Sequence, residues 1–473
     1  MRGTRTISAT LLAALILLMA SCAGGPERPV RPEAPPERAP TPEERELRDM
    51  ETLSDMLSSG DIAAAEAAVR AMIEKNPEKN EYRMLLSSIL VSSGDLAGAR
   101  AAAAEAVAAA PSDPQSLLLA AQVERFAGGE KALRLALDRV LVVAPANADA
   151  LAAYGDLWYG GKNYARAEEY YRKSLQSEPS NLSALLGLGR TLLRRGKAPE
   201  AERALDLAVT AHPESSQALA DRSQVRYALG KYKESLADLD LAVSMDPDVS
   251  WYRIERGRFL MDLGRQKDAL ADFDAAIRLK PDYFLPYVYR GGMFEQEGED
   301  AKARADYDAI VSLYPDYWYA FESIGATSFR LGDFSRALEG FEKAFSYSPG
   351  NYGYAILAVV SGYRAGRDAQ AGDFAAKAIA RVDREKDPIY WLMLRLLLDR
   401  SDASNELELK ISAEKNLDTK AAILFYLGEY WIIQGKTDLG LKYMLMAKEM
   451  GREGILEHRL MVRELERFSF RAE

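Results

Sequence analysis

Two residue types recur along this chain with a period of 34 residues. Prolines stand at Pro77, Pro111, Pro145, Pro179, Pro213, Pro247, Pro281, Pro315 and Pro349. Glycines keep the same interval at Gly60, Gly94, Gly128, Gly196, Gly230, Gly264, Gly298, Gly332 and Gly366, and the glycine due at position 162 stands one residue early, at Gly161. A period of this length indicates repeated copies of one small structural unit, which overrides the domain count suggested by length alone.

Each repeat has the pattern of two helices. Residues 182–195 and 199–211, for example, are two apolar-periodic segments, each long enough for about three to four helical turns. Glycine supplies the left-handed residue that ends the first helix, and proline, which cannot continue a helix, ends or follows the second. One such hairpin cannot bury its apolar face alone, so neighbouring hairpins must stack into a continuous core. The sequence therefore predicts an all-α solenoid.

The repeat resembles the tetratricopeptide repeat (TPR). In residues 148–181 the family pattern falls on Leu151, Tyr154, Gly155, Trp158, Ala167, Tyr171 and Pro179, with Ser174 where alanine is usual. Residues 182–215 match through Leu185, Leu188, Gly189, Ala201, Leu205, Ala208 and Pro213, and later repeats carry Gly257, Gly291 and Gly325 at the small eighth position. The resemblance implies about twelve stacked hairpins that form a superhelix.

Departures from the pattern define the expected ends of the array. Leu53 replaces the small residue of the first repeat, and Asp383 stands where a proline is due. We expect ten TPR repeats over residues 46–385 and two degenerate TPR-like repeats over residues 386–453. An amphipathic pattern through Ile455, Val462, Leu465 and Phe468 predicts a C-terminal capping helix over residues 454–473.

The only cysteine of the chain, Cys22, follows a short apolar run. Arg2 and Arg5 precede this run over residues 7–20, which is too short to span a bilayer comfortably, so residues 1–21 are predicted to be a secretory signal peptide. The sequence Met19-Ala20-Ser21-Cys22 resembles the bacterial lipoprotein processing box, which implies cleavage before Cys22 and lipidation of its thiol. Two or three acyl chains would make a stable membrane anchor. The alternative is an ordinary cleaved signal with an incidental cysteine.

Residues 22–45 contain Pro26, Pro29, Pro32, Pro35, Pro36, Pro40 and Pro42 and almost nothing apolar. Such a segment cannot form a core, and prolines at every third position suit a polyproline II helix. We interpret it as a semi-rigid tether between the lipidated cysteine and the repeats. A docking site for a proline-recognising domain is the alternative.

The remaining composition offers little material for catalysis. The net charge is −10, which disfavours nucleic-acid binding, and the histidines are His212 and His458 alone. Neither a zinc-type ligand set nor a Ser/His/Asp arrangement is indicated, so we expect no enzyme, no metal and no cofactor. Gly187-Leu188-Gly189 has the start of a dinucleotide loop, but close helix packing explains both glycines better.

The TPR resemblance also implies a concave groove lined by the first helix of each repeat. Alignment with the family pattern places these residues in the groove: Arg190, Arg194, Asp221, Tyr227, Trp251, Glu255, Arg258, Tyr289, Tyr319, Glu322, Phe329 and Arg330. Aromatic residues and arginines are frequent anchors of protein interfaces, although Tyr289 and Phe329 are equally compatible with packing between repeats. Chaperone-binding members grip a peptide carboxylate with lysine and asparagine, and this chain has neither at those positions.

The leading functional hypothesis is a membrane-anchored, non-enzymatic scaffold that binds a protein or peptide partner in the bacterial cell envelope. Assembly, secretion and export complexes are all compatible with it, and the outer membrane is favoured because Ala23 is not the aspartate that retains some lipoproteins at the inner membrane. The alternative is a regulatory or substrate-delivery adaptor of an envelope hydrolase or peptidase.

Overall fold

The computed structural model describes residues 41–399 and 404–469 of the chain. Within these ranges it contains 25 α-helices and no strands, in agreement with the predicted all-α solenoid of helical hairpins. The chain divides into two compact units, residues 1–238 and 239–473, and helix α13 (Tyr232–Met245) carries the boundary. The predicted signal peptide, Cys22 and nearly all of the proline-rich tether lie outside the described residues.

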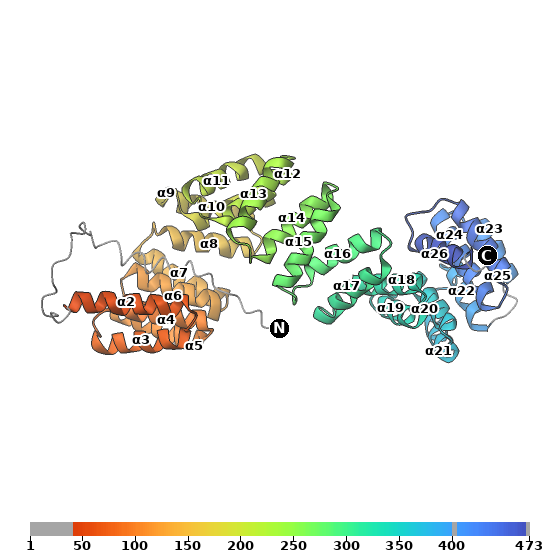
Figure 1. Ribbon diagram of the computed structural model, residues 1–473, viewed down its shortest axis with the longest axis horizontal. Coiled ribbons are helices and arrows are strands. Elements are labelled where there is room, and N and C mark those ends of the chain that lie inside the picture. The colour runs from red at the N-terminus through yellow and green to blue at the C-terminus, as the bar shows by residue number, and fades with distance from the viewer. Residues whose placement is uncertain (1–40, 400–403, 470–473) are drawn as a thin grey trace, which may run out of the picture. The chain divides into compact units, whose positions relative to one another are not determined.

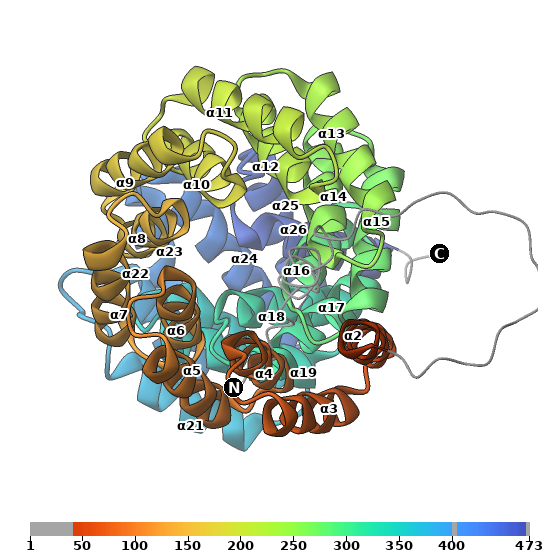
Figure 2. The same ribbon diagram turned by 90° about the vertical axis from the view of Figure 1, so that its left-hand side faces the viewer.

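Unit 1 contains five hairpins and the first helix of a sixth (Figure 1). Its helices are α2 (Pro42–Ser58), α3 (Ile62–Lys75), α4 (Asn80–Ser93), α5 (Leu96–Ala109), α6 (Pro114–Ala127), α7 (Glu130–Val143), α8 (Ala148–Gly160), α9 (Tyr164–Ser177), α10 (Leu182–Arg194), α11 (Ala198–Ala211) and α12 (Ser216–Ala228). Figure 2 shows that α4, α6, α8 and α10 lie on the inner side of the curve of this unit, with α5, α7, α9 and α11 on the outer side.

Unit 2 continues the same alternation with less regular lengths towards its end. Its helices after α13 are α14 (Ser250–Asp262), α15 (Gln266–Leu279), α16 (Leu285–Gln296), α17 (Asp300–Leu313), α18 (Tyr319–Leu331), α19 (Phe334–Tyr347), α20 (Tyr352–Arg364), α21 (Asp368–Ile379), α22 (Pro388–Asp399), α23 (Ser404–Ala413), α24 (Leu417–Ile433), α25 (Thr437–Glu449) and α26 (Leu456–Ser469). The helices α22 and α23 are short, in the part of the sequence that fits the repeat pattern poorly.

Small residues let the paired helices approach closely. A Cβ atom at Gly155 or Gly187 would overlap the ring of Tyr171, and one at Gly189 would overlap Leu205. The Tyr171 ring is buried between the backbones of α8 and α10. Close packing, and not a dinucleotide loop, therefore accounts for the two glycines of α10.

In two hairpins, the glycine between the helices does not have the predicted left-handed conformation. Gly94 ends α4 with a left-handed φ of 84°, as predicted, but Gly128 ends α6 with an extended φ of −103°. In the next repeat the left-handed position is 162, as the period requires, and Lys162 occupies it with a φ of 59°. Gly161, one residue early, has a φ of −74°. The glycine shift therefore places a strained lysine in this turn.

A repeated ion-pair pattern joins successive hairpins. In unit 2, Arg256 binds both carboxylate oxygens of Asp272 at 2.7 Å, and its third nitrogen binds Asp240 of the preceding repeat at 2.7 Å. Arg290 makes the same contacts with Asp306 and Asp274 one repeat later, at 2.6 to 2.9 Å. Arg222, Asp238 and Asp206 form the equivalent cluster in unit 1. Asp238 is buried in this cluster.

Candidate functional site

The groove side of unit 1 contains a cavity of about 280 Å³. Side chains from four successive first helices, α4, α6, α8 and α10, line it together with two leucines of α7. The apolar lining includes Val91, Leu119 and Leu137, which are buried, and Leu118 and Phe126, which are half-buried. The volume is slightly below the range of about 300–1,000 Å³ that is typical of small-molecule sites.

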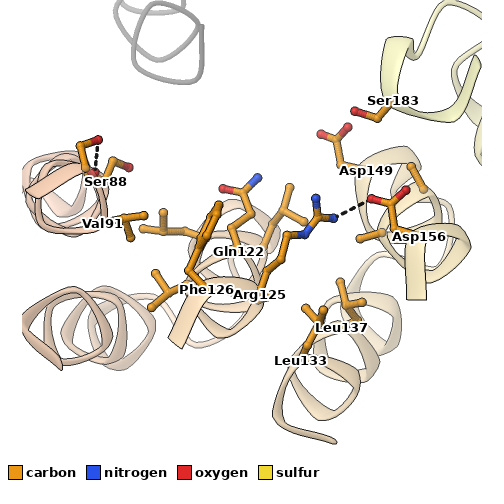
Figure 3. A pocket seen from close by; sticks show the side chains of 17 residues that line it. Ser88, Val91, Gln122, Arg125, Phe126, Leu133, Leu137, Asp149, Asp156 and Ser183 are labelled. Atoms are coloured by element: carbon orange, nitrogen blue, oxygen red, sulfur yellow. Dashed lines mark hydrogen bonds and ion pairs between the residues drawn. The ribbon is translucent and has the colours of Figure 1, made fainter. Parts of the chain in front are cut away.

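A charged and polar rim lies beside this apolar lining. In Figure 3, Arg125 of α6 and Asp156 of α8 point towards one another, and their nearest oxygen and nitrogen are 3.1 Å apart. The Tyr171 hydroxyl donates to the other oxygen of Asp156 at 2.8 Å, which fixes the carboxylate. Asp149 is exposed and accepts a hydrogen bond of 2.8 Å from the Asn181 side chain. Exposed carboxylates and one guanidinium therefore border an apolar floor.

The cavity arises from the small side chains of α8. Ala152 and Ala153 face it, whereas the residues 34 positions earlier are Leu118 and Leu119. The unusual turn between α6 and α7 adds a neighbouring cavity of about 390 Å³, lined by Gly128 and Gly129 among others. Reduced side-chain volume at one repeat thus leaves the groove locally open.

Four of the predicted groove residues lie in unit 1, next to this cavity along the array. Arg190 binds Asp221 through two nitrogens at 2.6 and 2.7 Å. Burial raises the pKa of the Asp221 carboxyl above its ordinary value, although Arg190 opposes this shift. Arg194 is exposed, and the half-buried Tyr227 packs edge-on against Tyr232. The Arg190–Asp221 pair therefore stabilises the stacking of α10 on α12. Arg194 is the most exposed of the four residues.

The other predicted residues lie in unit 2, and several are accessible. Trp251 keeps 40% of its surface exposed, and Tyr319 keeps 59%. Glu255 is buried and receives a 3.0 Å hydrogen bond from Arg258. Tyr289 stacks on Phe273 with ring centroids 5.3 Å apart, so it contributes to packing between repeats. Glu322, which is half-buried, accepts a hydrogen bond from the Tyr354 hydroxyl.

At Phe329 the structure shows the packing alternative, and at Arg330 it corrects the prediction of an accessible groove residue. The Phe329 side chain is fully buried and packs against Phe334 and Phe425. Arg330 is also buried and binds Asp300 at 2.7 Å and Glu295 at 3.1 Å. Neither side chain is available as an exposed anchor, because unit 2 uses both for its own packing.

The open cavity of unit 1 was missed by sequence reasoning, although the period contained a signal. Gln122 and Asp156 stand 68 and 34 residues before Arg190, so they share its position in the repeat. The groove prediction began at Arg190 and did not extend to these earlier repeats. The alanines of α8 were a second signal, because they replace leucines on the groove side.

The two histidines show no sign of a reactive centre in the structure. The His212 Nε2 lies 2.6 Å from the Ser180 carbonyl oxygen, which ties one inter-repeat turn to the next. His458 lies on α26. Across residues 41–399 and 404–469, no cluster of histidine, cysteine and carboxylate side chains is arranged to hold a metal ion. The described part of the chain also has no helix long and apolar enough to cross a membrane.

Comparison with family models agrees with the hairpin geometry. The tetratricopeptide repeat model matches residues 55–114 and 254–317, and the middle TPR-like domain of cilia and flagella-associated protein 70 matches residues 116–241. The chain is a tetratricopeptide-repeat protein. Proteins of this family are generally interaction scaffolds without catalytic activity, and TPR domains bind protein or peptide partners.

Solved structures similar to this TPR protein belong to the same family. A tetratricopeptide repeat protein from Parabacteroides merdae is 21% identical, with 50% of this chain and 93% of that chain covered and a TM-score of 0.39. PilF of Pseudomonas aeruginosa is 18% identical over 43% of this chain and 93% of its own, with a TM-score of 0.40. YrrB, described as a TPR protein with an unusual peptide-binding site, is 21% identical over 39% and 95%, with a TM-score of 0.31. A search of curated proteins gave no match.

Proposed function

We propose that this TPR protein is a lipid-anchored scaffold of the bacterial cell envelope that holds a segment of another protein in the groove of unit 1. The observation that carries the binding role is the cavity built by α4, α6, α8 and α10. Apolar side chains at its floor and a charged rim are the arrangement found in specific protein interfaces. Because successive packed helices position these side chains, the surface is rigid before the partner arrives.

The envelope location is proposed from the sequence. Cys22 follows a basic start and a short apolar run, and the proline-rich segment after it has the composition of a spacer. A lipid anchor with such a tether raises the effective concentration of whatever the groove holds near the membrane. The scaffold would then act by positioning its partner, with the outer membrane as the favoured site.

A photo-crosslinking amino acid at Gln122 tests the groove in cells. Gln122 lines the cavity, whereas Val142 on α7 is 81% exposed and away from it, so Val142 is the matched control position. We expect a discrete protein to be captured from Gln122 and not from Val142. The purified captured protein should bind the full chain, and Leu118→Asp should weaken this binding at least tenfold without changing the melting temperature substantially. Equal capture from both positions would contradict the proposal.

The anchor is tested separately by Cys22→Ala. Cells fed a fatty-acid analogue should label the unmodified protein and leave the variant unlabelled, and the variant should also move from the membrane fraction to the aqueous fraction. Label on the Cys22→Ala protein would show that another residue is acylated and that the proposed anchor is wrong.

A further inference from the structure

The last described helix, α26, does more than cover the end of the repeat array. It packs against α24 and α25, as a terminal cap would, and also against α18, three hairpins earlier (Figure 1). Arg459 of α26 reaches Glu295 at the end of α16, with nitrogen and oxygen 3.2 Å apart. The helix therefore extends along the first helices of unit 2, on the side where the family places its groove.

One side of α26 is buried and the other is exposed. Leu460, Met461 and Glu464 are buried, whereas Arg463 and Glu466 are exposed. Positions 460, 461 and 464 share one helical face. The helix thus presents Leu460, Met461 and Glu464 to unit 2, and Glu457 near its start accepts a hydrogen bond from the Tyr426 hydroxyl of α24.

The polar contacts of α26 are specific. Arg467 donates hydrogen bonds to the carbonyl oxygens of Phe329 and Arg330 at 3.2 and 2.9 Å, in the last turn of α18. The N–H of the capping Gly332 also donates to the Phe329 carbonyl, at 2.9 Å, and the C-terminus of a helix attracts a cation. Arg364 of α20 lies between two buried carboxylates, Glu464 of α26 at 3.0 Å and Glu429 of α24 at 2.5 Å.

The surface beneath α26 corresponds to the open surface of unit 1. Phe329 and Arg330 occupy the same repeat positions as Arg125 and Phe126, which line the cavity of unit 1, because the pairs are separated by six periods of 34 residues. These groove positions line an open cavity in unit 1, whereas α26 contacts them in unit 2.

The attachment of α26 includes a charged cluster like those that join the hairpins. Arg364 is half-buried and binds the buried carboxylates of Glu429 and Glu464, and Glu429 keeps one buried oxygen without a hydrogen-bond partner. Buried ion pairs contribute little net stability, because desolvation offsets much of their attraction. A turn with Gly451 at a φ of 63° joins α26 to α25.

We propose that the groove surface of unit 2 is a binding site for an amphipathic helix of a partner protein, and that α26 is its intramolecular occupant. The partner helix carries two adjacent apolar residues, an acidic residue one turn later that meets Arg364, and a basic residue that reaches the carbonyl end of α18. This inference does not rest on the proposed function, because it concerns the other unit. Since a tethered helix has a high effective concentration, the partner must outcompete α26 to bind.

Full-length variants and a fluorescent peptide of residues 454–473 test this inference. Glu464→Lys places a cation beside Arg364 and should release α26, so the variant should bind the peptide at least tenfold more tightly than the unmodified chain. Glu466→Lys makes the same charge change at an exposed position and should behave as the unmodified chain does. The result that would overturn the inference is equal peptide binding by all three proteins.

Hydrogen exchange of the same proteins separates release of α26 from unfolding. In the Glu464→Lys variant, the amides of α26 should exchange at least tenfold faster, while those of α18 to α25 keep their rates. Faster exchange throughout α18 to α26 would overturn the inference and make α26 an integral cap. A dimer of the unmodified chain that dissociates in the Glu464→Lys variant would also overturn it, because α26 would then come from a second copy.

Discussion

Lys162 occupies a backbone conformation that the repeat reserves for glycine. Its φ is 59°, and it is the only non-glycine residue with a positive φ among the described residues. For a residue with a Cβ atom this conformation costs roughly 1–2 kcal/mol, while glycine loses more entropy on folding. We therefore expect Lys162→Gly to stabilise the α8–α9 hairpin by about 0.5–1 kcal/mol.

Native-state hydrogen exchange of α8 and α9 measures this change. Lys162→Ala is the control. It removes the side-chain atoms beyond the Cβ but keeps the Cβ itself, and the backbone strain depends on the Cβ. If the glycine and alanine variants open with the same free energy, the left-handed turn is not the source of the difference.

The Arg190–Asp221 pair makes stability depend on pH. Burial raises the pKa of Asp221 despite Arg190, so the stabilising contribution of this group is complete below the ordinary aspartate pKa of about 3.9 and decreases as pH rises through the raised value. Removing Arg190 leaves a buried carboxylate without its cation and raises this pKa further. Arg190→Ala should therefore lower the free energy of unfolding by about 2 kcal/mol near pH 8 and by less near pH 5.

Urea unfolding of the Arg190→Ala protein at both pH values tests this prediction. The double variant with Asp221→Asn cannot ionise at position 221 and should lose the extra pH dependence. An equal destabilisation by Arg190→Ala at the two pH values would mean that Asp221 ionisation is not the cause.

At the scale of elements, the arginine clusters couple one hairpin to the next. Arg256 joins α14 to α13 and α15, and its partner Asp272 has only 5% of its side chain exposed. Arg256→Ala leaves this buried carboxylate with only the more distant Arg253, at 3.9 Å, which should cost about 2–4 kcal/mol. Arg265→Ala removes an exposed pair with Asp268 and should cost about 0.5 kcal/mol or less.

Opening free energies of the α14 and α15 amides measure both changes. Arg256→Ala should destabilise the hairpin much more than Arg265→Ala does, because Asp272 is buried and Asp268 is exposed. Similar small effects would show that solvent or neighbouring groups compensate for Asp272 when its cation is removed.

The hairpins were predictable because their signals are local. The sequence pattern placed a helix pair at residues 182–195 and 199–211, and the structure has α10 at Leu182–Arg194 and α11 at Ala198–Ala211. The position of α26 was not predictable, because Arg467 meets carbonyls 137 and 138 residues earlier in the chain. The cavity was not predictable either, because it forms where Ala152 and Ala153 of α8 face α6 and α7. The pattern of a single repeat does not describe contacts between repeats.

At the scale of the whole molecule, the two units present their groove surfaces in different states. Unit 1 keeps an open cavity lined by α4, α6, α8 and α10, and unit 2 places α26 against α18 and α24. Trp251 and Tyr319, which were predicted to line the groove, are exposed on first helices of unit 2. Under the two proposals, unit 1 would bind one partner directly, and unit 2 would bind a second partner only when α26 is displaced.

The groove of unit 1 is the surface on which we propose that a partner protein binds. Hydrogen exchange of the full chain is measured with and without the protein captured from Gln122. Binding should slow exchange in α4, α6, α8 and α10, with little change in α5, α7 and α9. Slower exchange confined to α5, α7 and α9, or to unit 2, would contradict it.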